Sequence, residues 1–223
     1  MVLFIDSSRL DEVRYFASWG IVAGVTTNPK IIATDGQATL DGLREQIQAI
    51  CEFVPAGGTC SMEVLAETTA EMVAEGRTYH AWRPGRIAVK IPMCEQGMPA
   101  IHQLARERIP VNVTCMMNVN QAYVAALAGA SYVSLFLGRI RDLGGDPLAA
   151  VATLRAVLER EGNKAQIIAG SIRHPQDVAD ATAAGAHIVT VTPDVLKKMI
   201  RNPNTDATIA EFAKAWEGMK KKR

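Results

Sequence analysis

The sequence lacks the features that mark a membrane protein or a nucleic-acid-binding protein. Among its 223 residues there is no run of about 18 apolar residues, the length that a membrane-spanning helix needs, and Asp6 interrupts the opening run Val2–Ile5. We therefore expect neither a transmembrane span nor a signal peptide. The formal net charge of +1 provides no overall field that would attract nucleic acid or an anionic membrane.

Motifs for disulfides, metals and cofactors are also absent. The four cysteines, Cys51, Cys60, Cys94 and Cys115, form no C-x-x-C pair, so we interpret them as reduced thiols of a cytoplasmic protein. The four histidines show no H-E-x-x-H or other ligand spacing. We expect no metal site and no cofactor.

What the sequence does contain is a regular alternation of strand-like and helix-like segments. Apolar residues make up 48% and charged residues 21%, which is typical of a globular protein. Eight short apolar runs read as strands of a parallel sheet with both faces covered. They are Val2–Ile5, Gly24–Thr27, Cys60–Leu65, Ile87–Ile91, Val111–Cys115, Tyr132–Leu137, Gln166–Ala169 and Ile188–Val191.

Helical periodicity separates these runs. Leu148, Val151, Leu154 and Leu158 recur three or four residues apart after Pro147, a residue suited to the first turn of a helix. No low-complexity linker divides the chain, so we expect one α/β domain over residues 1–223. The pattern predicts a (β/α)₈ barrel followed by a C-terminal helix. The alternative, an open doubly wound sheet, is less favoured because no G-x-G-x-x-G follows the first strand.

Lys90 is the residue that points most directly to chemistry. It lies within the apolar run Ile87–Ile91, which ends at Pro92. Burial penalises a charged ammonium and favours the neutral amine, which can attack a carbonyl and form a Schiff base. The structural alternative is a lysine that reaches solvent from the end of its strand.

Polar residues follow the strands at their carboxyl ends, where barrel enzymes place their active sites. Each also has a structural explanation: Asp6 or Asn28 could cap a helix, and Glu63 could form an ion pair with Lys90. The residues at these ends are Asp6, Thr27, Asn28, Glu63, Lys90, Thr114, Ser134, Arg139, Ser171 and Arg173.

Four segments resemble the transaldolase family, in particular its short-chain branch, which includes fructose 6-phosphate aldolase. They are Gly24-Val25-Thr26-Thr27-Asn28-Pro29, the Val-Lys-Ile-Pro sequence around Lys90, Ser134-Leu135-Phe136-Leu137-Gly138-Arg139-Ile140, and Ala169-Gly170-Ser171-Ile172-Arg173. The resemblance extends from the first strand to the C-terminal helix.

The resemblance implies a metal-free aldol mechanism of the Schiff-base type. Lys90 would attack the ketose carbonyl, and Asp6 would take the proton from the C4 hydroxyl as the C3–C4 bond breaks. Glu63 and Thr114 would hold the water that moves protons while the carbinolamine forms and collapses.

The resemblance also implies how a sugar phosphate would bind. Asn28 would hydrogen-bond the dihydroxyacetone unit, with Thr27, Asn112, Ser134 and Phe136 beside it. The substrate's phosphate would bind Arg139, Ser171 and Arg173, since guanidinium groups suit phosphate geometry. Without the resemblance these arginines would be ordinary exposed loop residues.

Two positions favour one branch of this family. Glu63 and Phe136 stand where the aldolase branch carries glutamine and tyrosine, so the resemblance implies a transaldolase that transfers dihydroxyacetone between sugar phosphates. Leu135 and the sequence Gly170-Ser171-Ile172 depart from the family's usual pattern, which leaves acceptor specificity open. The alternatives are an aldolase that releases free dihydroxyacetone and a catalytically silent sugar-phosphate-binding barrel.

The last predicted helix has an apolar stripe. Phe212, Trp216 and Met219 follow i, i+4, i+7 spacing. The resemblance implies a homo-oligomer, a pentamer or decamer, in which this helix reaches a neighbouring copy. The alternative is that the stripe packs on its own barrel.

Overall fold

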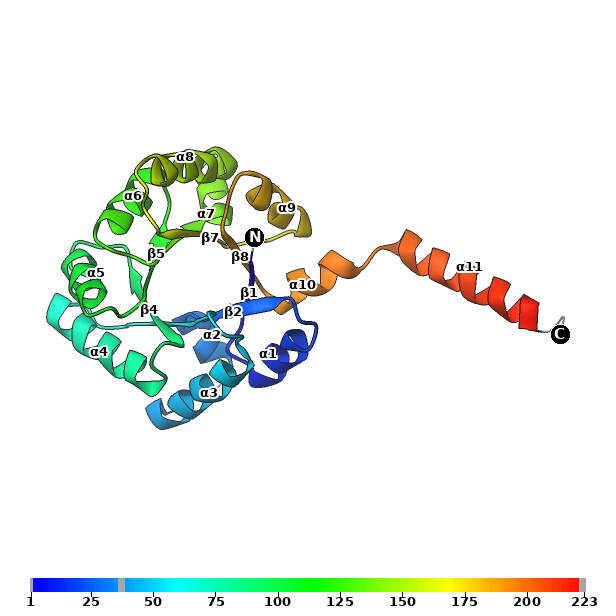
Figure 1. Ribbon diagram of the computed structural model, residues 1–223, viewed down its shortest axis with the longest axis horizontal. Coiled ribbons are helices and arrows are strands. Elements are labelled where there is room, and N and C mark those ends of the chain that lie inside the picture. Colours follow the sequence, from blue (N-terminus) through cyan, green and yellow to red (C-terminus); the bar gives the residue numbers. More distant parts are fainter. Residues whose placement is uncertain (1, 36–38, 221–223) are drawn as a thin grey trace.

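The chain forms a closed eight-stranded parallel barrel, which confirms the predicted fold. The computed structural model describes residues 2–35 and 39–220. Each strand pairs with its neighbours in chain order, and the last pairs with the first (Figure 1). The strands are β1 (Val2–Asp6), β2 (Val22–Thr26), β3 (Cys60–Glu63), β4 (Ile87–Pro92), β5 (Val111–Met116), β6 (Tyr132–Phe136), β7 (Gln166–Gly170) and β8 (Ile188–Val191).

Helices form a ring outside the barrel, except for the last one (Figure 1). Within the described ranges, no helix is both long enough and apolar enough to cross a membrane. The helices are α1 (Leu10–Ala17), α2 (Pro29–Thr34), α3 (Leu40–Phe53), α4 (Thr69–Trp82), α5 (Gly97–Arg106), α6 (Val119–Leu127), α7 (Leu137–Asp142), α8 (Pro147–Arg160), α9 (Pro175–Ala183), α10 (Pro193–Ile200) and α11 (Pro203–Lys220).

The predicted strand limits are right to within two residues, and the differences occur at the ends. The second strand starts at Val22 rather than Gly24 and ends at Thr26 rather than Thr27. The sixth strand ends at Phe136 because Leu137 already begins α7. Pro147 is the first residue of α8, as predicted, and the Asp146 carboxylate accepts hydrogen bonds from the backbone of the first turn.

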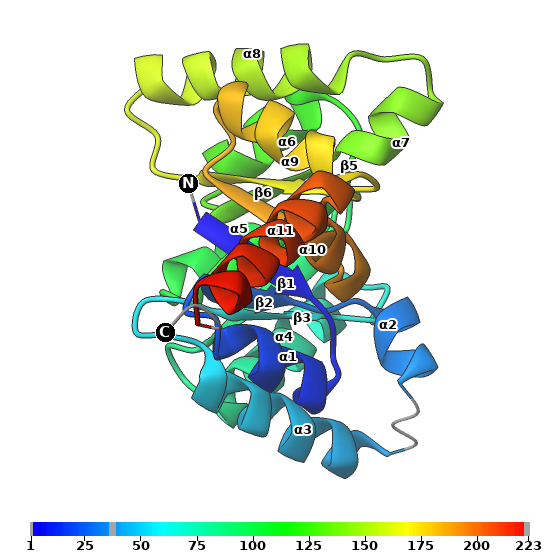
Figure 2. The same ribbon diagram turned by 90° about the vertical axis from the view of Figure 1, so that its right-hand side faces the viewer.

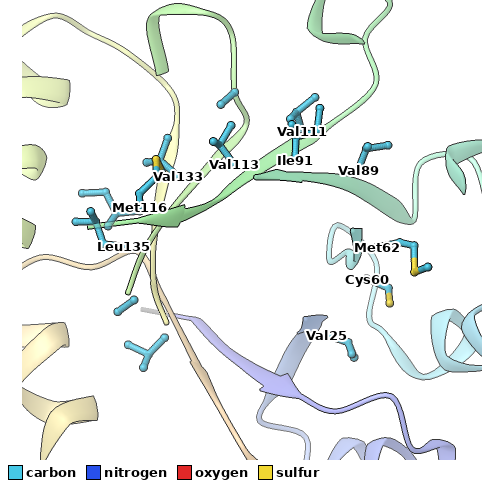
Figure 3. Packing of buried hydrophobic residues seen from close by; sticks show 14 of the residues in the cluster. Val25, Cys60, Met62, Val89, Ile91, Val111, Val113, Met116, Val133 and Leu135 are labelled. Atoms are coloured by element: carbon cyan, nitrogen blue, oxygen red, sulfur yellow. The ribbon is translucent and has the colours of Figure 1, made fainter. Parts of the chain in front are cut away.

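The main hydrophobic core lies between the strands and the ring of helices. In β4, Val89 and Ile91 are fully buried in this core, while Lys90 lines a cavity on the other face of the same strand. Figure 3 shows the packed side chains of neighbouring strands, including Val111 and Val113 of β5. Strand alternation thus separates an apolar outer layer from a polar interior.

A small apolar cluster fills the barrel interior further from the carboxyl ends of the strands. Phe4, Ile168 and Ile188 come from β1, β7 and β8 and are nearly inaccessible to solvent. Gly24 makes room for the Phe4 ring, because a Cβ at Gly24 would lie 2.4 Å from the ring. This cluster excludes water from the interior next to the polar residues that follow on the same strands.

The C-terminal helix α11 stands away from the barrel (Figures 1 and 2). None of its described residues is buried, and the side chains of Phe212, Trp216 and Met219 are 58–67% exposed. The predicted apolar stripe therefore does not pack on its own barrel.

Candidate active site

A cavity of about 210 Å³ opens at the carboxyl ends of the strands. Eight of the predicted site residues line it, together with three that the sequence analysis did not select. The predicted ones are Asp6, Asn28, Lys90, Thr114, Ser134, Phe136, Arg139 and Ser171. The additional ones are Thr26, Gly170 and Thr190.

Lys90 is held inside the barrel by two oxygen atoms. Its Nζ lies 3.1 Å from Glu63 Oε2 and donates a 2.9 Å hydrogen bond to the backbone carbonyl of Thr27. The side chains of Lys90 and Glu63 are only 6% and 11% exposed. Their opposite charges offset part of the cost of burial, and the pair places a carboxylate within proton-transfer distance of the amine.

Asp6 lies at the end of β1, at the same rim as Lys90. Burial raises the pKa of its carboxyl above the usual value, whereas a hydrogen bond from Thr26 and the charge of Lys90 act in the opposite direction. The Thr26 hydroxyl donates to Asp6 Oδ1 over 2.6 Å and is also 2.6 Å from the hydroxyl of Thr190. A partly buried carboxyl at the edge of a cavity is suited to exchange a proton with a substrate.

Hydrogen-bonded polar side chains connect β3, β5 and β6. Asn112 on β5 donates to the Ser61 hydroxyl on β3 over 3.0 Å, and Ser134 on β6 donates to Asn112 Oδ1 over 2.7 Å. Asn112 is fully buried and fixes the Ser134 hydroxyl through this hydrogen bond.

Thr114 differs from these residues because its buried hydroxyl has no hydrogen-bond partner among the described residues. A buried polar atom normally finds a partner. Since Thr114 lines the cavity, a water or a substrate group in the cavity can supply that partner.

Thr27 and Asn28 follow β2 and have different positions. The Thr27 hydroxyl is fully buried and donates to the Ser61 carbonyl, so its side chain supports the strands rather than lining the cavity. Asn28 lines the cavity while its Oδ1 accepts from the Ile31 N–H at the start of α2. Among the described residues the amide NH₂ of Asn28 has no hydrogen-bond partner, so it can donate to a ligand in the cavity.

Arginines gather where β6 and β7 end. Arg139 lines the cavity with Ser171. Arg173 is held by Asp142, with Nη1 and Nη2 donating over 2.7 and 2.5 Å. Gly138 lies between these groups: a Cβ there would be 2.8 Å from both Ser171 Oγ and Arg173 Nε.

Asp177 anchors the loop that carries Ser171 and Arg173. It accepts hydrogen bonds from Arg141 Nη2 and from the backbone N–H groups of Arg173 and His174. Burial, the largest single influence, raises the pKa of Asp177, but these three hydrogen bonds outweigh it and the pKa lies below its usual value.

Together these features define the class of protein. It is a (β/α)₈ barrel with a buried lysine–carboxylate pair, a second, partly buried carboxyl and arginines at the carboxyl ends of its strands. Residues 3–223 match the Transaldolase/Fructose-6-phosphate aldolase family, and the chain belongs to that family.

Relatives of similar length share about two fifths of its residues. A probable transaldolase of Moorella thermoacetica is 43% identical over 222 residues, which cover 100% of both chains. One of Oceanobacillus iheyensis is 40% identical over 220 residues, 99% of this chain and 100% of the relative. Probable transaldolase 2 of Listeria monocytogenes is 41% identical over 222 residues, 100% of this chain and 99% of the relative.

The buried anchor Asp177 yields a pH-dependent prediction. Its lowered pKa means that folding favours the ionised form, so the stabilisation is present above the unfolded pKa of about 3.9 and is lost as the pH falls through the folded pKa. We expect Asp177→Asn to lower the free energy of unfolding by about 1.5–3 kcal/mol at pH 7. The difference from the unmodified protein should shrink below about pH 4.

Asp142→Asn is the matched control, because Asp142 also pairs with an arginine of this loop but is exposed. Urea unfolding at a series of pH values measures both variants. Equal losses for the two variants, or a pH-independent loss for Asp177→Asn, would contradict the assignment of Asp177 as the anchor.

Proposed function

We propose that this protein is a transaldolase. It transfers a dihydroxyacetone unit from a ketose phosphate, fructose 6-phosphate or sedoheptulose 7-phosphate, to an aldose phosphate through a Schiff base on Lys90. The observation that carries the proposal is a cavity lined by Lys90, Asp6 and Arg139, in which the Lys90 ammonium is paired with Glu63.

Covalent attachment begins at Lys90. Glu63 Oε2, 3.1 Å from Nζ, takes a proton from the ammonium, and the resulting amine attacks the ketose carbonyl at C2. Loss of water from the carbinolamine then needs a proton for the departing hydroxyl. Glu63 returns it through a water held by Thr114, whose hydroxyl has no partner within the described part of the chain.

Bond cleavage follows at Asp6. The carboxylate takes the proton from the C4 hydroxyl, the C3–C4 bond breaks, and its electron pair moves into the protonated imine to give an enamine. The aldehyde leaves. An acceptor aldehyde then enters, the enamine carbon attacks its carbonyl, and Asp6 returns the proton to the new hydroxyl.

Substrate binding is divided between the two sides of the cavity. Asn28 and Ser134, supported by Asn112, hold the hydroxyls of the dihydroxyacetone unit. Arg139, Ser171 and Arg173 bind the phosphate through charge-assisted hydrogen bonds. For Arg173 this requires that the guanidinium offer its remaining N–H groups, since Asp142 occupies two of them.

Phe136 favours transfer over release of free dihydroxyacetone. It lines the cavity beside Lys90 and has no hydroxyl with which to hold water or donate a proton. Exclusion of water protects the enamine from protonation and hydrolysis. The enamine therefore persists until an aldehyde acceptor arrives.

We further propose that the enzyme works in the cytoplasm. Cys51, Cys60, Cys94 and Cys115 are all free thiols, and thiols stay reduced in that compartment.

The transfer reaction is tested with fructose 6-phosphate as donor. Alone, it should release glyceraldehyde 3-phosphate slowly, and erythrose 4-phosphate should accelerate the release strongly. Lys90→Met should lower kcat roughly a thousandfold or more, as loss of a covalent nucleophile does, whereas the control Lys30→Met should not. Phe136→Tyr should raise the release of free dihydroxyacetone. Fast release by the unmodified enzyme without acceptor would instead identify an aldolase.

The exposed stripe on α11 supports the proposal of a homo-oligomer, and the family resemblance favours a pentamer or decamer. Ile209, Phe212, Trp216 and Met219 lie on one face of the helix and are 58–67% exposed. An apolar surface of this kind is typical of a contact with another chain. We propose that α11 packs on a neighbouring copy.

Light scattering on the full chain at micromolar concentration tests this assembly. We expect a mass of several protomers, and dissociation when Phe212 and Trp216 are both replaced by glutamate. Lys214→Glu is the matched control because residue 214 lies on the opposite face of the helix. A monomeric unmodified protein, or equal dissociation by the control, would contradict the proposed role of α11.

A further inference from the structure

The hydroxyls of Thr26 and Thr190 connect Asp6 to two neighbouring strands. Asp6 ends β1, which lies between β2 and β8 in the barrel. Thr26 is the last residue of β2, and Thr190 lies in β8. Both threonines are at least 92% buried, with 3% and 8% of their surfaces exposed. The two hydroxyls and the carboxylate therefore interact where solvent is largely excluded.

The donors in this group can be assigned by counting hydrogens. A threonine hydroxyl has one hydrogen and two lone pairs. Thr26 uses its hydrogen on Asp6 Oδ1, at 2.6 Å, because an ionised carboxylate can only accept. The 2.6 Å contact between the two hydroxyls then requires Thr190 to donate and Thr26 to accept. The hydrogen bonds run in one direction, from Thr190 through Thr26 to Asp6.

We propose that Thr190 and Thr26 form a directed hydroxyl relay that orients the Asp6 carboxylate and stabilises its ionised form. The relay occupies Oδ1 and leaves Oδ2, which has no hydrogen bond among the described residues, for the substrate. Thr26 and Thr190 are positioning residues, since they act through Asp6. The catalytic consequence rests on the proposed function, whereas the effect on Asp6 itself does not.

Other charged groups surround Asp6 and must be separated from the relay. Lys90 faces it from β4 and favours the carboxylate. A second cavity adjoins Asp6 on its other side, and its charged lining residues are Arg9, Glu12, Lys30, Asp35 and Asp194. None of these five contributes to the shift at Asp6. Burial opposes the ionisation of Asp6, whereas the Thr26 hydrogen bond and the charge of Lys90 both favour it.

The relay is tested by titrating Asp6 in the full-length resting protein. The carboxyl carbon is observed by NMR after ¹³C-aspartate labelling and is assigned with Asp6→Asn. Thr26→Val removes the donor while keeping the shape of the side chain, and the Asp6 pKa should rise by about one to two pH units. Thr190→Val should raise it by less, because the Thr26 hydroxyl is then present but no longer polarised.

The double variant provides the sharpest comparison. Because the hydroxyls act in series, Thr190→Val should have no further effect once Thr26 is valine. Thr26→Ser and Thr190→Ser, which retain the hydroxyls, should restore the original titration. In the pH profile of the transfer reaction, the acid limb should shift in the same order.

The relay would be overturned if the two substitutions changed the Asp6 pKa additively in the double variant. It would also be overturned if Thr26→Val left the Asp6 titration unchanged. These results are independent of whether the protein transfers dihydroxyacetone. A relay that is confirmed by titration in an enzyme without transfer activity would instead overturn only the proposed function.

Discussion

The site depends on a charged amine placed inside a barrel. The Lys90 ammonium is almost completely removed from water, and without a counter-charge its burial would cost several kcal/mol. Glu63 and the Thr27 carbonyl offset that cost. In the proposed mechanism the same pair accounts for reactivity, because the carboxylate that stabilises the ammonium is also the group that takes its proton. Removing Lys90 or Glu63 alone would leave the other charge buried without a partner, at a cost of about 3–5 kcal/mol.

The barrel satisfies this requirement through strand alternation. Val89 and Ile91 face the apolar outer core, which fixes Lys90 toward the interior, and the cluster around Phe4 keeps the floor of the interior dry. The polar partners of Lys90 then have to come from residues of neighbouring strands that are level with it in the sheet register. Glu63 is directly opposite Lys90 in the pairing of β3 with β4, so the register of the sheet places the carboxylate next to the amine.

Alternation also explains how much the sequence could predict. Apolar runs identified all eight strands, and the residues after them identified most of the cavity lining. Thr26 and Thr190 were missed because they lie within apolar runs, where a threonine is an ordinary strand residue. Thr27 lies outside the cavity lining because it directly follows Thr26, which lines the cavity, and successive side chains of a strand point to opposite faces. The pairing of Arg173 with Asp142 depends on how the end of α7 meets the loop after β7, which no local sequence pattern encodes.

The central claim is that Lys90 forms the covalent bond to the substrate. The most direct measurement is borohydride reduction in the presence of fructose 6-phosphate, followed by peptide mapping by mass spectrometry. We predict a single reduced adduct on the peptide that contains Lys90, and its loss in Lys90→Met with the fold intact. An adduct on Lys30 or Lys164, or turnover without any trapped adduct, would contradict the account.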